Sequence, residues 1–241
     1  MTERDYSGPD SRHVQQMFAG IAHRYDFLNH FLSLSVDRRW RKTAARKIGE
    51  LAGLSPGACL DVCSGTGDLA MALDQSLQTQ VIASDFTHAM LTRANQKFAG
   101  YAIRVVEADA LDLPFPSMSF DAVTMAFGLR NLQDPLRGLC EMRRILKPGG
   151  AAVVLEFSKP VVPVFRQIFG FYFRAILPFL GKTISGDAAA YQYLPDSVQR
   201  FPDQEGLLEL MRRAGFVHTG YQNLSGGIAA LHWGRAVKLP S

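Results

Sequence analysis

Short apolar runs alternate with amphipathic stretches through the centre of the chain. Runs of this length predict strands, and they are ACLDVC, QVIAS, AIRVVEA, SFDAVTMA and AAVVLEF at 58–63, 80–84, 102–108, 119–126 and 151–157. Helices are expected between them, at 68–77, at 87–98 and from Pro135, with Lys147-Pro148-Gly149-Gly150 as the stop of the last. Strands that alternate with helices indicate βαβ units and therefore a parallel sheet.

Helical patterns also flank this central region. Apolar positions fall on one stripe over 11–33, with Asp10 or Ser11 as the cap, and over 38–51. The aromatic-rich stretch 161–181 interrupts the alternation, and helices are expected at 187–199 and 203–213. Two strand-like runs, FVHTGYQNL and GGIAALHWGRAV, close the chain, and their short Ser225-Gly226-Gly227 link favours an antiparallel hairpin.

Composition narrows the class of protein. The 241 residues are 47% hydrophobic and 20% charged, which is typical of a globular chain that can bury a sizeable core. Its three cysteines form no C-x-x-C pair and its histidines are scattered, so neither a disulfide framework nor a metal site is expected. A polar N-terminus and the lack of a long apolar run predict a cytoplasmic protein.

The charge of the chain is uneven. A net charge of +4 is too small an excess to predict a nucleic-acid partner. Basic residues nevertheless cluster on the helix expected at 38–51, opposite its apolar stripe: Arg38, Arg39, Arg41, Lys42, Arg46 and Lys47. This cluster is either a solvated helix face or a surface that rests on anionic lipid, where each cation contributes roughly 1 kcal/mol.

The segment LDVCSGTGDLA, at residues 60–70, carries the clearest chemical signal. Its strand, glycine turn and helix start match the G-x-G-x-x-A pattern of dinucleotide sites, and Asp85 follows at the end of the second strand. Asp61 and Asp68 would repel the pyrophosphate of NAD at this turn. S-adenosylmethionine (SAM) has no phosphate and carries an ammonium and a sulfonium, so the same carboxylates favour it. A turn needed only for packing is the third alternative.

The order D-x-x-x-G-x-G, acidic strand end, A-D-A, F-D-x-V and L-K-P-G-G resembles the class I SAM-dependent methyltransferases. More specific segments resemble the quinone-biosynthesis C-methyltransferases: VQQMFAGIAHRYDFLNHFLSLSVDRRWR, MAFGLRNLQD, LEFSKP, YQYLPDSVQRFPDQ and GGIAALHWG. The resemblance covers about 12–235. One departure is Cys63, where the wider family has a further glycine.

The resemblance implies an α/β, Rossmann-like fold: a seven-stranded, mostly parallel sheet with an antiparallel terminal hairpin. It also implies a single methyltransferase domain. Its parts would be an N-terminal helical lid (1–53), a SAM-binding core (54–158), a helical insertion (159–214) and the strand hairpin (215–241). The residues that match the family's cofactor contacts are Thr66, Asp85, Asp109 and Ala110, and Asp61, Gly65, Gly67 and Phe86 complete the expected cofactor site. Ala126 cannot supply the serine contact that some members have.

The activity implied is SAM-dependent C-methylation of demethylmenaquinol to menaquinol. The alternatives are the polyprenyl benzoquinol precursor of ubiquinone, another small aromatic acceptor, or a non-enzymatic binding module. A polyprenyl quinol implies peripheral membrane contact, and the oligomeric state stays open, with a homodimer as one option. Arg130 at the sheet edge could favour the phenolate of the quinol, or form a structural salt bridge.

Further acceptor contacts are expected among Tyr25, Asp26, Asn131, Asp187, Tyr191 and His232. For Tyr25 and Asp26 the alternative is helix packing. For His232, in an apolar strand, the alternative is a satisfied core histidine.

Overall fold

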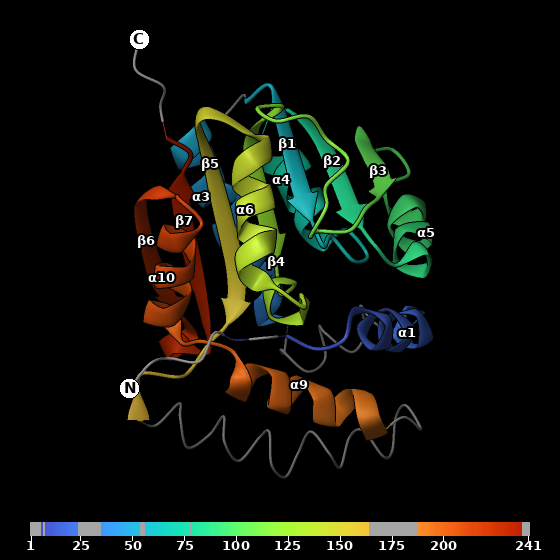
Figure 1. Cartoon of the computed structure of the whole chain (residues 1–241). Helices are drawn as coiled ribbons and strands as arrows, with labels where there is room; N and C mark the ends of the chain where they lie inside the picture. The colour runs from blue at the N-terminus through green and yellow to red at the C-terminus, as the bar shows by residue number, and fades with distance from the viewer. Residues whose placement is uncertain are drawn as a thin grey trace.

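The computed structural model describes residues 6, 8–23, 35–53, 56–77, 79–163 and 188–237. A seven-stranded sheet runs through its centre in the order β3-β2-β1-β4-β5-β7-β6 (Figure 1). The strands are β1 Ala58–Val62, β2 Gln80–Asp85, β3 Ile103–Glu107, β4 Phe120–Ala126, β5 Leu146–Phe157, β6 Val217–Leu224 and β7 Ala229–Arg235. β7 is antiparallel to β5 and β6, and the other pairs are parallel. The predicted sheet and terminal hairpin are therefore confirmed.

Helices cover both faces of the sheet. α3 (Val36–Ala52), α4 (Asp68–Ser76) and α5 (His88–Lys97) bury Ile48, Leu73 and Ala94 in one apolar cluster. α6 (Pro135–Ile145) and α10 (Gln204–Arg213) bury Met142 and Met211 in the other. Because both faces are covered, the inner strands are mostly apolar, as the sequence pattern indicated, with Asp61 of β1 and Thr124 of β4 as buried polar exceptions.

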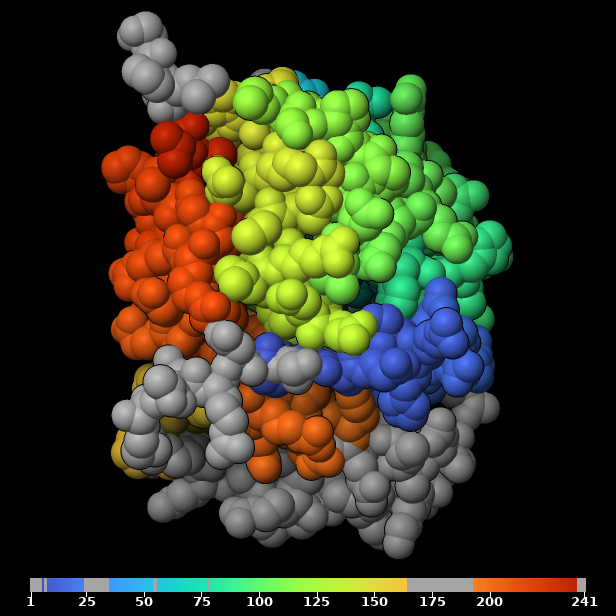
Figure 2. Space-filling view, in the orientation of Figure 1, coloured from blue at the N-terminus to red at the C-terminus, as the bar shows by residue number. Residues whose placement is uncertain are grey.

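Two further helices, α1 (Ser11–Ile21) and α9 (Ala188–Arg200), lie beyond the carboxyl ends of the parallel strands (Figure 1). In the space-filling view α1 lies against the core, with α9 beside it (Figure 2). The side chain of Asp10 accepts hydrogen bonds from the backbone N–H groups of Arg12 and His13, which confirms the predicted start of α1. The remainder of the helix expected over 11–33, from residue 24, lies outside the described residues. None of the helices within the described ranges is long and apolar enough to cross a membrane.

The segment Lys147–Gly150 differs from its prediction. The sequence predicts that this segment ends the helix before the strand begins. In the structure α6 already ends at Ile145, and the segment is part of β5, which begins at Leu146. The register of β4 against β5 shifts between the Phe120–Leu146 pair and the Ala122–Ala151 pair. Gly149 has a φ of +79°, a conformation that glycine adopts without strain. The glycines therefore form a bulge inside the strand.

The expected basic face of the second helix also needs correction. Trp40, Ala44 and Ile48 are buried as predicted, but Arg41 is buried with them. Its guanidinium pairs with Asp37, one turn earlier in α3. Position 41 therefore points inward, and the exposed cations of the first two turns of α3 are Arg38, Arg39 and Lys42.

Candidate active site

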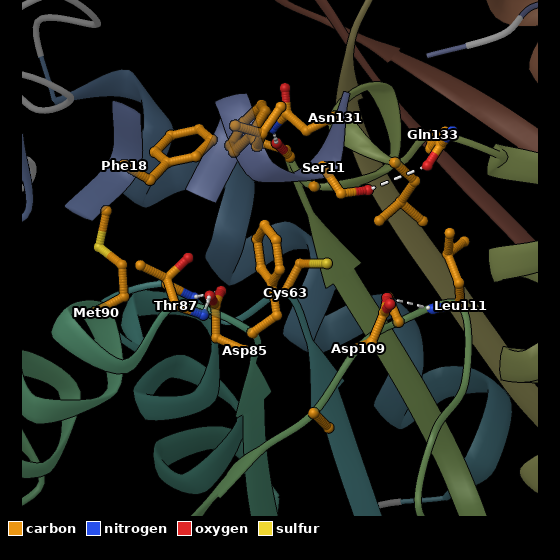
Figure 3. A pocket seen from close by; sticks show the side chains of 18 of the residues that line it. Ser11, Phe18, Cys63, Asp85, Thr87, Met90, Asp109, Leu111, Asn131 and Gln133 are labelled. Atoms are coloured by element: carbon orange, nitrogen blue, oxygen red, sulfur yellow. Dashed lines mark hydrogen bonds between the residues drawn. The ribbon is translucent and has the colours of Figure 1, made fainter. Parts of the chain in front are cut away.

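A pocket opens at the carboxyl edge of the sheet, beside the glycine turn between β1 and α4 (Figure 3). It is lined by the turn itself, by the ends of β2 and β3, and by the segment that follows β4. Val14 and Phe18 of α1 close one side, and Gln15 Nε2 of that helix donates to the carbonyl oxygen of Phe86 at 2.8 Å. Open α/β sheets bind ligands at this edge, so the pocket is the candidate site.

The glycine turn forms despite its cysteine. Cys63 has a φ of +53°, Gly65 of +56° and Gly67 of +88°. A side chain on Gly67 would collide with the ring of Phe98. Cys63 thus adopts a left-handed conformation where the wider family has glycine, and its side chain lies beside Gly128 at the pocket wall.

Asp85 anchors the turn and faces the pocket. Its Oδ2 accepts a hydrogen bond from Gly65 N at 2.9 Å, and its Oδ1 accepts one from Thr87 N at 2.8 Å. Burial raises the pKa of Asp85, while these backbone donors oppose that rise. A carboxylate held in this way has spare lone pairs for the two hydroxyls of a ribose.

Phe86, Asp109 and Ala110 line the same pocket. Asp109 lies at the exposed rim, where its Oδ1 accepts from Leu111 N at 2.9 Å, and Ala110 is buried. The ends of β2 and β3 thus bring together four of the predicted cofactor residues.

Asp61 and Thr66 lie behind the pocket wall. Asp61 is 1% exposed and its Oδ1 accepts from Thr124 Oγ1 at 2.9 Å, while its Oδ2 has no hydrogen-bond partner among the described residues. Burial raises the pKa of Asp61 to about 7, against the opposing effects of Thr124 and the charge of Arg41. The side chain of Thr66 is buried, with its Oγ1 3.5 Å from Lys97 Nζ.

The pocket fits SAM better than a dinucleotide. No lysine or arginine occurs among the described residues that line it, whereas Asp85 and Asp109 do. A pyrophosphate would therefore meet carboxylates, with no cation among these lining residues to compensate its charge. The orphaned Oδ2 of Asp61 suits an ammonium or a water that bridges to one. When bound, SAM supplies an activated methyl group on its sulfonium.

Arg130 lies outside the lining of the pocket. It is 6% exposed, its Nη1 is 2.9 Å from Glu156 Oε1, and it also donates to the carbonyl oxygen of Phe127. The structure thus contains the salt bridge that the sequence offered as the alternative. A direct role of Arg130 in catalysis stays a prediction.

Asn131, the next residue, does line the pocket, and it has a partner that the sequence analysis missed. Tyr193 of α9 donates to Asn131 Oδ1 at 2.7 Å, while Asn131 Nδ2 donates to the carbonyl oxygen of Phe127 at 3.1 Å. The signal was available, since Tyr193 stands two positions after Tyr191 in the segment YQYLP. Which tyrosine faces the sheet edge depends on how α9 packs.

His232 lies in the core under α10. It is 1% exposed, its Nε2 donates to the carbonyl oxygen of Gln204 at 2.9 Å, and its ring stacks on Tyr221. Burial lowers its pKa to about 4. These contacts match the core-histidine alternative, and a substrate contact stays a prediction.

The other predicted acceptor contacts fall outside the described part of the chain. Tyr25, Asp26 and Asp187 lie outside the described residues, as does most of the aromatic stretch 161–181. Tyr191 lies within α9, but its side chain is outside the described part of the chain. Across the described ranges, no group of three or more His, Cys, Asp or Glu side chains could hold a metal ion.

Similar sequences were found over most of the chain. A demethylmenaquinone methyltransferase of Deinococcus radiodurans is 49% identical, over 90% of this chain and 90% of that protein. One of Thermus thermophilus is 47% identical, over 90% of this chain and 99% of that protein. The ubiquinone/menaquinone biosynthesis C-methyltransferase UbiE of Geobacter sulfurreducens is 44% identical, over 92% and 87%.

Solved structures share the fold. A SAM-dependent methyltransferase from Thermotoga maritima superposes with a TM-score of 0.62 at 18% identity, covering 91% of this chain and 98% of that one. The cyclase SpnF superposes with a TM-score of 0.70 at 18% identity, covering 98% and 100%. The second match shows that the fold alone does not determine the reaction.

A family model of the ubiE/COQ5 methyltransferases matches residues 7–236. The chain therefore belongs to the ubiE/COQ5 methyltransferase family, and the expected methyl transfer from SAM is confirmed.

Proposed function

We propose that this protein methylates a ring carbon of demethylmenaquinol to give menaquinol, with SAM bound in the pocket at the carboxyl edge of the sheet. The observation that carries the proposal is a pocket lined by Asp85 and Asp109, in a chain 49% identical to a demethylmenaquinone methyltransferase. The ribose would bond to Asp85, and the adenine would lie near Asp109 and Ala110. The ammonium would approach the glycine turn on the side of Asp61.

The acceptor ring needs electron density at one carbon. Ionising a neighbouring phenol supplies it, and because the pKa of a phenol is near ~10, a polarising neighbour helps. The ring carbon then bonds to the methyl carbon as the bond from that carbon to sulfur breaks, which leaves S-adenosylhomocysteine. The methylated ring carbon finally gives its proton to water, and the ring becomes aromatic again. Aligning the three atoms supplies much of the rate, roughly 7–11 kcal/mol in the best cases.

Asn131 is the described polar residue best placed to meet the phenolate. It lines the pocket, Tyr193 accounts for its side-chain oxygen, and one N–H of its amide donates to Phe127, which leaves the second N–H as the donor. Arg130 would act on the phenolate from behind this residue, through its charge. Of the predicted N-terminal lid (1–53), only α1 would act as a lid in this proposal, because α1 covers the pocket whereas α3 packs on the sheet.

Product analysis tests the proposal. The purified protein is incubated with methyl-labelled SAM and reduced demethylmenaquinone, and label in menaquinone is the expected result. Calorimetry should show binding of SAM or S-adenosylhomocysteine and no comparable binding of NAD. A host that lacks the gene should accumulate demethylmenaquinone. If SAM binds but neither demethylmenaquinol nor the benzoquinol precursor of ubiquinone is labelled, the acceptor is another small aromatic compound and the proposal is wrong.

Methylation of the polyprenyl benzoquinol precursor of ubiquinone is the second candidate. It is supported by the 44% identical relative from Geobacter sulfurreducens, whose name covers both quinones. An assay in which reduced demethylmenaquinone and the benzoquinol compete decides between the two candidates. If the first proposal holds, demethylmenaquinol is methylated at the higher kcat/KM.

Peripheral contact with a membrane belongs to the same proposal. α3 starts at the carboxyl edge of the sheet, where Trp40 packs edge-on against Phe157 at the end of β5. Its exposed Arg38, Arg39 and Lys42 therefore lie towards the edge that holds the pocket. Flotation with anionic vesicles should recover the protein at low salt and lose it at high salt. Equal recovery with neutral vesicles would leave these residues as a solvated face. A homodimer remains a separate prediction, tested by light scattering.

A further inference from the structure

Arg41 is a buried cation beside the glycine turn, although its sequence neighbours are exposed. Its side chain is 9% exposed, and Nη1 pairs with Asp37 Oδ2. Nη2 lies 3.9 Å from Asp68 Oδ2, too far for a hydrogen bond. The guanidinium carbon is 5.4 Å from the centroid of the Phe127 ring, and Phe127 lines the pocket. Arg41 is therefore not a lining residue, but it packs from α3 against a residue that forms the wall of the candidate cofactor site.

The charges around the turn are unequal. Within the described part of the chain, carboxylates are contributed by Asp37, Asp61, Asp68 and Asp85, and cations by Arg41 and Lys97. This excess of negative charge attracts the ammonium and the sulfonium of SAM. The amino-acid end of SAM also carries a carboxylate, however, and that group needs a cation if it is to be desolvated beside the turn.

Of the two cations, Arg41 is better placed for that carboxylate. Lys97 Nζ reaches the turn from α5, where it bonds to Asp68 and Thr66, which both lie outside the pocket lining. Arg41 packs on a lining residue. A guanidinium has five donors in a planar fork that matches a carboxylate, and the Asp37 bond uses only part of that capacity.

We propose that Arg41 binds the α-carboxylate at the amino-acid end of SAM, and so selects nucleosides that carry an amino-acid tail. The inference deepens the proposed function, because it rests on the same cofactor pocket. Asp37 then holds the guanidinium in position from one turn earlier on α3, as a positioning residue. The competing explanation is a purely structural ion pair that joins α3 to α4.

A ligand panel separates these explanations. S-adenosylhomocysteine has the full amino-acid end, 5′-methylthioadenosine lacks it, and decarboxylated SAM lacks only the carboxylate. Replacing Arg41 alone would take the guanidinium from the buried carboxylate of Asp37, so the main variant is Asp37→Asn/Arg41→Gln, which removes both charges. Arg39→Gln, an exposed arginine of the same helix, is the matched control.

Calorimetry on the folded proteins gives the test. The double variant should bind S-adenosylhomocysteine roughly 10- to 150-fold more weakly than the parent, the range for a lost hydrogen-bonded charge pair. Its affinity for 5′-methylthioadenosine should stay within about twofold of the parent's, because this ligand has no amino-acid end and does not contact position 41. The parent should prefer SAM to decarboxylated SAM, and the variant should not. The Arg39→Gln control should behave as the parent.

Two results would overturn the inference alone: equal losses for both adenosine ligands, or no loss for either, in a variant that folds. If the double variant does not fold, Arg41→Lys keeps the charge without the fork. If Arg41→Lys still prefers S-adenosylhomocysteine to 5′-methylthioadenosine as strongly as the parent does, the inference is overturned, because it depends on the planar fork. Failure of the parent to bind S-adenosylhomocysteine would instead overturn the cofactor site itself.

Discussion

Arg130 and Glu156 form a buried ion pair that joins the segments FGLRN and EFSKP. Nη1 of Arg130 lies 2.9 Å from Oε1 of Glu156, and the two side chains are 7% and 1% exposed. Tyr6 donates to the backbone oxygen of Arg130 at 2.9 Å, and Arg130 Nε lies 3.4 Å from Ser197 Oγ of α9. The pair thus connects the N-terminal segment, the end of β4, β5 and α9 beside the pocket.

Replacing Arg130 with methionine should therefore destabilise the protein. Glu156 would be left buried without its counter-charge, which typically costs ~3–5 kcal/mol. The double variant Arg130→Met/Glu156→Gln should recover much of that loss, as measured by urea unfolding. If Arg130 instead acts mainly on the transition state through its charge, Arg130→Met should melt like the parent and lose on the order of a hundredfold in turnover. That outcome would restore a direct catalytic role.

Asp85→Asn should weaken the binding of SAM. The amide keeps the shape but loses the charge and can accept at only one of the two atoms that now accept from Gly65 N and Thr87 N. We expect a loss of roughly 1.5–3 kcal/mol of binding free energy by calorimetry. Glu209→Gln on the exposed face of α10 is the control. SAM affinity equal to the parent's would remove Asp85 from the site.

The affinity for S-adenosylhomocysteine should depend on pH through Asp61. The pKa of this carboxyl is raised to about 7, so below that pH it is protonated in the free protein. A ligand ammonium favours the ionised form, and affinity should therefore rise towards pH 7 and then level off. Each unit below the pKa costs up to roughly tenfold. Asp61→Asn should flatten the profile, and a parent profile already flat from pH 5.5 to 8 would contradict the contact.

Gly128 makes room for Cys63. A Cβ on Gly128 would lie 2.5 Å from Cys63 Cβ and 3.2 Å from Met125 Cγ. Gly128→Ala should therefore destabilise the protein by about 1–3 kcal/mol through overpacking. Adding Cys63→Gly should restore stability, because it removes the clash and relieves a left-handed residue that costs roughly 1–2 kcal/mol. Gly20→Ala in α1, with open space at its Cβ, is the control. If the changes in unfolding free energy of Gly128→Ala and Cys63→Gly simply add in the double variant, the two positions do not share this space.

His232 should make the protein sensitive to acid. Its pKa is about 4 in the folded state and near 6.5 when unfolded. Between these values the unfolded state binds a proton that the folded state does not, so stability falls as pH decreases from 6.5 to 4. The loss approaches ~3 kcal/mol, and urea unfolding at several pH values should show it in the parent but not in His232→Phe.

The exposed His13 supplies the control for this measurement, as His13→Gln. Turnover of His232→Phe should follow its folded fraction. A loss of turnover in folded protein would return His232 to the acceptor site.

The order of strands and helices could be predicted from the sequence, because each depends on local periodicity and on caps such as Asp10 and Asp134. The glycine turn and Asp85 were also predictable. The turn follows the end of β1 and Asp85 is the last residue of β2, so both lie at the carboxyl edge of the sheet. The choice of SAM over a dinucleotide followed from the carboxylate of Asp61 near that turn.

The tertiary structure alone decided the environment of each charged side chain. Arg41 shares a helix with exposed arginines, and only packing against the sheet turns it inward to Asp37 and Phe127. Arg130 meets Glu156 across 26 positions, and Asn131 meets Tyr193 across 62. Such pairs arise where distant segments converge, and one-dimensional periodicity carries no information about which polar groups then face one another. Burial, which raises the pKa of Asp61 and lowers that of His232, is likewise a property of the folded chain.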